Sequence, residues 1–189
     1  WGSRVDFIPG SGGPGSGDAT IEVDIYAGIK PTLGMLTFDL GVIYYAYPGS
    51  RNGGPLGTSD LDYVELKAGV SAAIDKLSLG VTGFYSPDYF AGSGDTWTVE
   101  GSAAYTLPQV WIFTPTVSAL VGATFGDDNP ASAFVFNFGD DYVYWNAGLA
   151  LAVDKFTFDF RYWDTDNDSY FNPDLTDERF VFTAKVALP

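Results

Sequence analysis

Strict alternation between apolar and polar residues constrains the fold of this chain more than any other feature. Residues 155–162 read KFTFDFRY, so that aromatic residues alternate with lysine, threonine, aspartate and arginine. A period of two residues is that of a β-strand, whose successive side chains point to opposite faces. No segment has convincing helical periodicity, and Gly, Pro, Asp and Asn separate the alternating segments. We therefore predict an all-β chain with strands at 1–8, 19–29, 35–47, 61–74, 76–86, 96–107, 113–125, 142–153, 155–164 and 178–188.

The connections between these strands alternate in length. Short connections lie around 30–34, 75, 108–112 and 154, whereas long ones lie at 9–18, 48–60, 87–95, 126–141 and 165–177. This is expected when each strand turns back beside the previous one, so that one rim of the sheet carries short turns and the other carries long loops. Bacterial outer-membrane barrels have that asymmetry. The pattern predicts a single antiparallel, up-and-down β-barrel domain of ten strands over residues 1–189.

Alternation alone does not say which face meets water. A soluble barrel encloses its apolar side chains, whereas a membrane barrel points them outward. The polar face of the predicted strands is mainly Gly, Ser, Thr and Ala, and only 17% of the residues are charged, below the roughly 25% of soluble domains. Small residues fit a crowded interior better than a solvated surface, so this face is predicted to line a lumen.

The charges on the polar face balance, with seven acids and seven bases. The residues that we predict to line the lumen are Arg4, Asp6, Glu22, Asp24, Asp39, Glu65, Lys67, Lys76, Glu100, Lys155, Asp159, Arg161, Arg179 and Lys185. Because partly desolvated charges need partners, this balance favours an enclosed face. Chance placement on a solvated face is the alternative, but it does not explain why the remaining acids lie elsewhere.

Aromatic residues collect near the strand ends of the apolar face. Near the long-loop rim lie Phe7, Tyr44, Tyr85, Trp97, Phe125, Trp145, Tyr162 and Phe180, and near the short-turn rim lie Phe38, Tyr105, Phe113 and Phe156. Aromatic rings at both interfaces are typical of a membrane barrel. General β-propensity explains their presence in strands, but less well their position. The barrel is therefore predicted to be transmembrane.

The long connections and their flanks are strongly acidic. They hold fifteen acids, opposed only by Arg51: Asp18, Asp60, Asp62, Asp88, Asp95, Asp127, Asp128, Asp140, Asp141, Asp164, Asp166, Asp168, Asp174, Asp177 and Glu178. A rim of this composition attracts cations and repels anions. It indicates either a cation-favouring entrance or divalent-ion contact with neighbouring lipopolysaccharide. The plainer alternative is that external loops are acidic for solubility.

One acidic run has the spacing of a calcium loop. Asp164, Asp166 and Asp168 match its first, third and fifth positions. However, Ser169 stands where the loop needs glycine and Leu175 where it needs glutamate. A looser Ca²⁺ or Mg²⁺ site stays open as a hypothesis, and a solvated loop is the preferred interpretation. No other cofactor is expected.

Composition excludes several classes of protein. The chain has no histidine and no cysteine, which removes Ser-His-Asp and Cys-His catalysis, thiolate metal sites and disulfides. With 24 acids against 9 bases, a nucleic-acid partner is not expected. No stretch reaches the roughly 18 apolar residues of a membrane helix. We do not expect an enzyme.

Several segments resemble a known family. They are TFDLGVIYYAYPGS (37–50), YVELKAGVSA (63–72), LSLGVTGFYSPDYF (77–90), YWNAGLALAV (144–153), FDFRYWDTD (158–166) and DERFVFTAKVAL (177–188). Together they resemble the TorF family of bacterial outer-membrane porins over nearly the full chain. The resemblance implies a barrel of about twelve strands. We therefore expect the domain to be N-terminally incomplete, beginning inside the third strand of the family.

The leading functional hypothesis is a porin-like barrel of the bacterial outer membrane. It would allow passive passage of small solutes or ions, with a cation-favouring acidic rim. Its expected partners are outer-membrane lipid or lipopolysaccharide and the small solutes, and a homo-oligomer stays open. The alternative is a non-conducting structural or surface-binding barrel that acts through its long loops. A soluble ligand-binding barrel is a third hypothesis.

Overall fold

The computed structural model describes residues 2–7, 21–48, 61–126, 141–166 and 176–187. They form an all-β structure with one short 3-10 turn, η1 (Phe90–Gly92). The strands are β1 (Gly2–Phe7), β2 (Ile21–Ile29), β3 (Thr32–Leu33), β4 (Leu36–Ala46), β5 (Tyr63–Ile74), β6 (Leu77–Ser86), β7 (Thr96–Thr106), β8 (Thr114–Gly126), β9 (Tyr142–Val153), β10 (Phe156–Thr165) and β11 (Arg179–Val186). No helix among the described residues is long and apolar enough to cross a membrane.

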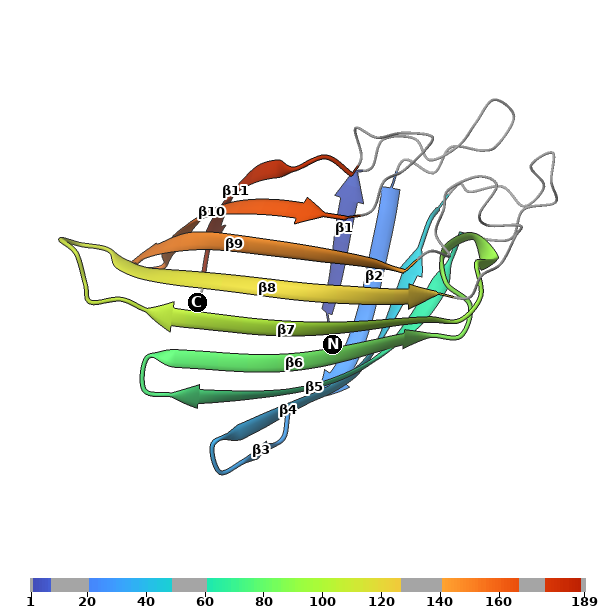
Figure 1. Cartoon of the computed structure of the whole chain (residues 1–189), viewed down its shortest axis with the longest axis horizontal. Coiled ribbons are helices and arrows are strands. Elements are labelled where there is room, and N and C mark those ends of the chain that lie inside the picture. Colours follow the sequence, from blue (N-terminus) through green and yellow to red (C-terminus); the bar gives the residue numbers. More distant parts are fainter. Residues whose placement is uncertain (1, 8–20, 49–60, 127–140, 167–175, 188–189) are drawn as a thin grey trace.

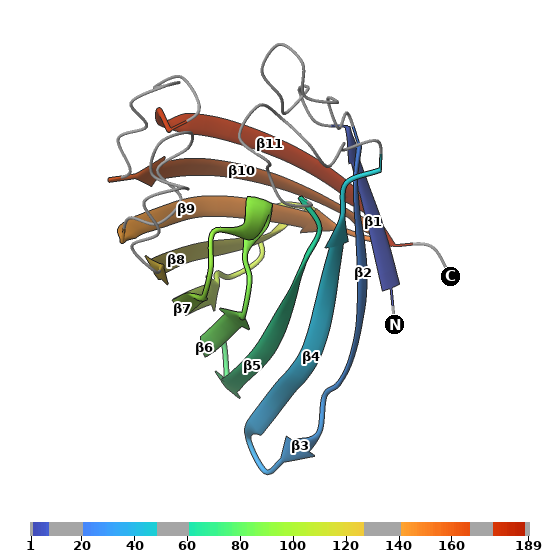
Figure 2. The ribbon, with the colours of Figure 1, turned by 90° about the vertical axis from the view of Figure 1, so that its right-hand side faces the viewer.

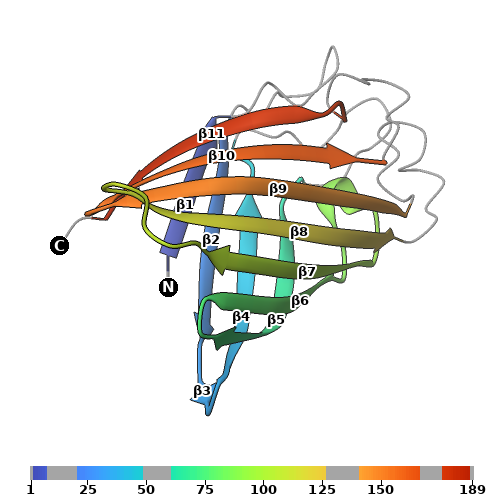
Figure 3. The same ribbon diagram turned by 60° about the vertical axis from the view of Figure 1, so that its left-hand side comes forward.

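All strands belong to one antiparallel sheet, in which sequential strands are neighbours. The order runs from β1 through β2 and β4 to β11, and β3 pairs only with β4. Figure 1 and Figure 3 show the long strands side by side, and Figure 2 shows the sheet bent into a deep trough. This confirms the predicted all-β, antiparallel, up-and-down architecture. The described strands are not closed into a barrel, because β1 and β11 lie at the two ends of the order.

Each of the ten predicted strands is present, with ends within two residues of the prediction. The sheet has eleven strands rather than ten, because β3 lies within the predicted short connection at 30–34. It is held by a backbone hydrogen bond from the Phe38 amide to the Pro31 carbonyl at 2.9 Å. A strand of two residues is too short to give a recognisable alternation, so the sequence pattern missed it.

The short connections reverse the chain with residues in the left-handed region. Their φ angles are 52° at Asp75, 51° at Asp154, 54° at Trp111 and 61° at Gly34. Gly tolerates this region freely, and Asp tolerates it better than most residues do. These turns lie at one end of the long strands, seen at the left of Figure 1 for β5–β6 and β7–β8. Tight turns fix the pairing register, which decides the face to which each side chain points.

The register gathers the apolar side chains of all long strands on one face. One row across β4 to β9 consists of Phe38, Val70, Val81, Gly101, Val121 and Trp145. Large side chains of this face are exposed, for example Val81 at 54% and Phe160 at 51%. We call it the outer face. The opposite face lines the concave side of the trough, and we call it the concave face.

Burial is inverted relative to a soluble domain. Among the described residues, the only buried hydrophobic residue is Tyr47, whereas Asp24, Ser86, Ser93, Thr96, Thr124 and Asn146 are buried polar residues. The polar residues are shielded because they face the concavity of the trough. Sequence alternation therefore produces a polar interior and an apolar exterior.

The left-handed backbone at Asp154 predicts how a β-branched residue at this position would change the stability of the protein. Replacing Asp154 by Val forces a β-branched residue into the left-handed region, so the free energy of unfolding should fall by about 1–2 kcal/mol. Urea titration of the purified protein measures this change. Asp154→Gly is the matched control and should be at least as stable as the parent. Equal destabilisation by both variants would contradict the assigned backbone geometry.

Candidate functional site

The concave face carries most of the charged residues that the sequence assigned to the lumen. The strand register places Arg4 opposite Asp24 and Asp6 opposite Glu22. The others in strands share that parity: Asp39, Glu65, Lys67, Glu100, Asp159, Arg161, Arg179 and Lys185. Lys76 and Lys155 lie instead in two-residue turns outside the strands, and both are exposed.

Two clusters of ion pairs stand on this face. The Lys67 Nζ atom lies 2.7 Å from Asp39 Oδ2, and the Lys30 Nζ atom lies 3.2 Å from the same oxygen. Arg161 binds Asp159 at 3.1 Å through its Nη2 atom. These contacts match the pairing that was expected of partly desolvated charges.

Arg161 also reaches across the sheet to neutral partners. It donates hydrogen bonds to Asn146 Oδ1 on β9 and to Ser118 Oγ on β8, the latter at 2.8 Å. Gly148 leaves the necessary space, since a Cβ atom there would meet the guanidinium carbon at 3.0 Å. Asn146 is 3% exposed. This network fixes a cation on β10 against three strands of the concave face.

Three glutamates are stabilised in a different way. The phenol of Tyr47 donates to Glu22 at 2.7 Å, that of Tyr45 to Glu65 at 2.9 Å, and that of Tyr144 to Glu100 at 2.6 Å. Within the described part of the chain, the partners of these glutamates are phenols rather than Lys or Arg.

Phenols leave the glutamate charges in place. A phenol stabilises a carboxylate by a hydrogen bond without neutralising it. The pairing expected from sequence therefore does not extend to these three glutamates, and this part of the concave face keeps an excess of negative charge.

The contact between Tyr144 and Glu100 depends on a glycine. Tyr144 lies on β9 and Glu100 on β7, so the ring must cross β8 in the row that contains Gly122. A Cβ atom at Gly122 would collide with the ring and hydroxyl of Tyr144. Glycine is thus required by close side-chain approach and not by its backbone angles.

A cluster of aromatic rings covers the concave face near the long-loop end. It consists of Tyr45, Tyr47, Tyr63, Tyr89 and Phe90, and we call it the tyrosine cluster. Ring centroids are 4.4 Å apart for Tyr45 and Tyr63, 4.7 Å for Tyr63 and Tyr89, and 5.2 Å for Tyr47 and Phe90. The β6–β7 connection thereby packs onto β4 and β5, and Figure 2 shows it rising within the trough.

Hydrogen bonds hold the β6–β7 connection in this shape. The Tyr89 amide donates to the Gly94 carbonyl at 2.9 Å, and the Gly94 amide donates to Asp88 Oδ1 at 3.3 Å. Burial raises the pKa of both Tyr47 and Tyr89 above the usual range of tyrosine. These phenols are therefore neutral at physiological pH and remain hydrogen-bond donors.

Two hollows lie on the concave face. One, of about 380 Å³, is lined by Ser102, Ser118, Asn146, Arg161 and Trp163 among others. The second, of about 390 Å³, lies nearer the long-loop end and includes Tyr144, Asp164, Asp177 and Arg179. Trp163 lines both hollows, so it stands between the middle of the concave face and its rim.

The outer face has aromatic rings at the long-loop end, as predicted. Exposed examples are Trp97 at 55% and Phe125 at 48%. Three tyrosines of this group direct their phenols to rim carboxylates: Tyr44 to Asp62 at 2.6 Å, Tyr85 to Asp95 at 3.3 Å and Tyr162 to Asp164 at 3.0 Å. Their rings thus lie on the apolar surface while their polar ends reach the acidic rim.

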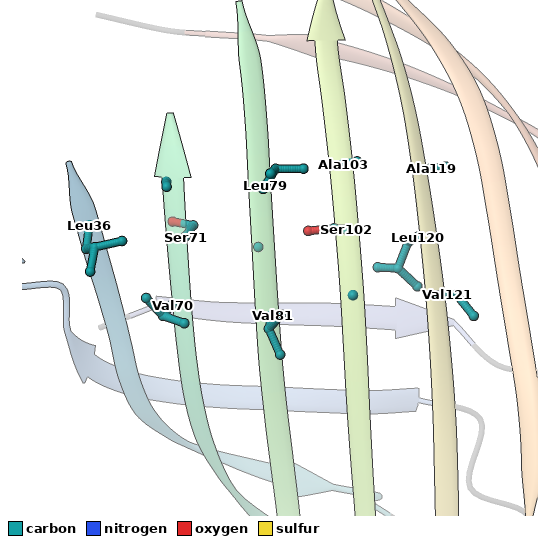
Figure 4. Close-up of a pocket in the computed structure, with 13 residues that line it drawn as sticks. Leu36, Val70, Ser71, Leu79, Val81, Ser102, Ala103, Ala119, Leu120 and Val121 are labelled. Carbon is teal, nitrogen blue, oxygen red and sulfur yellow. The ribbon is translucent and has the colours of Figure 1, made fainter. Parts of the chain in front are cut away.

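The middle of the outer face is uncharged. A shallow hollow of about 620 Å³ extends over β4 to β8 (Figure 4). Leu36, Val70, Leu79, Val81 and Val121 surround small residues there, and no charged side chain lines it. At the opposite, short-turn end, Trp111 is 81% exposed. The alternation pattern did not identify this aromatic residue because it lies in a turn.

The acidic calcium-like run is only partly described. Asp164 accepts hydrogen bonds from Tyr162 and from the Thr165 amide, and Asp166 accepts one from the Val143 amide at 2.6 Å. Asp168 lies outside the described residues, as do Asp18, Asp60, Asp127, Asp128, Asp140 and Asp174 of the predicted rim. No group of three metal-ligating residues occurs in the part of the chain that the structure describes. The loop metal site stays a prediction.

These features define an antiparallel all-β protein with an apolar outer face and a polar, tyrosine-rich concave face. The chain belongs to the family described as a bacterial protein of unknown function (Gcw_chp), whose model matches residues 1–187. No curated protein and no solved structure matches it. The family description contains no link to TorF porins, so that resemblance stays a prediction.

Sequence reasoning did not identify the contacts of Tyr45 with Glu65 and of Tyr47 with Glu22, nor the inward β6–β7 connection. The sequence did contain a signal for these contacts. Tyr45 and Tyr47 have the same odd parity as Asp39, so alternation predicts that they point to the same face. Tyr89 and Phe90 lie in a connection without periodicity, and their positions depend on tertiary packing alone.

The role of Gly122 gives a testable prediction. Gly122→Ala should displace Tyr144 from Glu100 and lower the free energy of unfolding by about 1.5–3 kcal/mol, the value of a hydrogen bond to a charged group. Urea titration of the purified protein measures this fall. In a Tyr144→Ala background the same change should have little further effect.

Gly101→Ala is the matched control for this prediction. The new Cβ atom would lie 3.9 Å from Val121, which is ordinary contact, so stability should be nearly unchanged. If Gly122→Ala and Gly101→Ala behave alike, Tyr144 does not need the space above Gly122.

Proposed function

We propose that this protein is a transmembrane β-barrel of the bacterial outer membrane with a porin-like role. It allows passive passage of small solutes or ions along its polar concave face. The single observation that carries the proposal is the inverted burial: large apolar side chains are exposed on the outer face and polar side chains are shielded. Exposed apolar surface of this extent needs an apolar partner, and lipid is the partner that fits a whole sheet face.

The dimensions of the strands support this proposal. The long strands from β4 to β10 contain 10 to 13 residues. A tilted strand needs about 9–11 residues to cross the apolar part of a membrane. The aromatic rings at the long-loop end, with their phenols bound to rim acids, fit the outer interface between lipid and water.

The concave face supports a route for solutes. It is lined by Ser, Thr, Asn and ion-paired side chains, which water can solvate. The rim residues that are described include Asp62, Asp95 and Asp164, and the excess of acid favours cations. Outer-membrane lipid or lipopolysaccharide and small cations are thus the proposed partners. The proposal includes no enzymatic activity and no cofactor.

Barrel closure belongs to the proposal. β1 and β11 each have one neighbouring strand in the described sheet. Backbone groups at membrane depth must all be hydrogen-bonded, so only a closed barrel is stable there. The TorF resemblance implies about twelve strands, which would cover both edges.

The tyrosine cluster favours a second candidate function. Aromatic rings from β4, β5 and the β6–β7 connection fill part of the concave side. A barrel of this size has a narrow interior, so side chains are able to occlude it. In that case the protein would be a non-conducting barrel that acts through its loops. A soluble barrel is disfavoured, because its apolar face would be enclosed rather than exposed.

Planar-bilayer recording tests the proposed function. Inserted protein should give discrete channel events, and the reversal potential in a KCl gradient should show preference for cations. The preference should weaken at high ionic strength, because salt screens the acidic groups. Correctly inserted protein that never conducts would rule out the porin-like role and leave the structural candidate.

A further inference from the structure

We propose that the β6–β7 connection is the constriction of the passage, and that the phenol-bound Glu22, Glu65 and Glu100 make this constriction select cations. The inference deepens the proposed function and rests on it. It assigns size and charge selectivity to residues inside the trough, whereas the acidic rim lies outside.

The β6–β7 connection lies over neighbouring strands of the sheet. Tyr89 packs on Tyr63 of β5, and Phe90 packs on Tyr47, which follows β4. The connection therefore extends from the ends of β6 and β7 over β5 to the end of β4, on the concave side. Figure 2 shows it within the trough rather than outside it.

Polar side chains at and beneath the connection are buried. Ser86 is 1% exposed and Ser93 is 2% exposed, although serine is ordinarily a surface residue. Thr96, the partner of Ser86 in the sheet register, is also buried. The connection therefore lies tightly against the strand ends.

Carboxylates lie directly beside the rings of the tyrosine cluster. Tyr45 and Tyr47 of the cluster are themselves the donors to Glu65 and Glu22. A passing solute therefore meets aromatic rings and negative carboxylates at the same place. Each carboxylate keeps further acceptor capacity beyond its single phenol. Small cations are favoured there, and anions are repelled.

The ion pairs of the concave face are separate from the phenol-bound glutamates. Lys67 and Arg161 are bound by Asp39 and Asp159 and do not contact these glutamates. The negative charge of these glutamates is therefore not compensated by Lys67 or Arg161.

The test uses the intact protein in planar bilayers with two sets of variants. Tyr89→Ala with Phe90→Ala removes the rings of the constriction, and single-channel conductance should rise by about twofold or more. Glu65→Gln with Glu100→Gln keeps acceptors for the phenols but removes charge. The reversal potential in a KCl gradient should then move toward zero, with little change in conductance.

Matched controls separate these effects from general damage. Tyr105→Ala removes an aromatic ring from the outer face, where it is 44% exposed, and should leave conductance unchanged. Asp154→Asn removes a negative charge in a short turn and should leave the reversal potential nearly unchanged.

A cysteine variant tests the same inference if the double variant Tyr89→Ala with Phe90→Ala, the alanine pair, does not fold. The chain has no cysteine, so Tyr89→Cys provides one reactive thiol. A bulky water-soluble thiol reagent should reduce the current in steps if residue 89 lies in the constriction. An unaltered current after complete modification would overturn the inference.

The outcomes distinguish the inference from the proposed function. If the parent conducts and the alanine pair behaves like Tyr105→Ala, the constriction is refuted while the porin-like role stands. If the parent is silent but the alanine pair conducts, the connection is a plug and passive passage by the parent is refuted. If neither the parent nor the alanine pair conducts when inserted, the constriction and the porin-like role are both refuted.

Discussion

The rest of the structure depends on the antiparallel register, which is fixed by tight turns with left-handed residues such as Asp75 and Asp154. A slip of one residue would exchange the two faces of a strand. With the observed register, apolar side chains form one uninterrupted outer face and polar side chains converge on the concave face. The inverted burial, the aromatic rings at the strand ends and the hollows all follow from that single constraint.

The concave face uses two ways to stabilise shielded charges, and they have different consequences. Ion pairs such as Lys67 with Asp39 neutralise charge, whereas phenols such as Tyr144 stabilise Glu100 and leave it negative. Neutral phenols persist at physiological pH where burial raises the pKa, as it does for Tyr47. The proposed selectivity therefore comes from the choice of tyrosine, rather than lysine or arginine, as partner.

Alternation predicted each long strand and its faces, because a period of two residues is a local property that sequence records directly. It missed β3, which has only two residues. For the candidate site, parity placed Glu22, Glu65 and Glu100 correctly on one face, but it gave them the wrong kind of partner. Contacts such as Tyr63 with Tyr89 join a strand to a connection without periodicity, so only tertiary packing reveals them.

The central claim is that the outer face meets lipid and the concave face meets water. Thr82 and Val81 are adjacent on β6 and point to the concave and outer faces respectively. Because the chain has no cysteine, single Thr82→Cys and Val81→Cys variants in lipid vesicles can be treated with a membrane-impermeant thiol reagent. The account predicts that the thiol at 82 reacts and the thiol at 81 does not. Reaction at 81 with protection at 82 would contradict it.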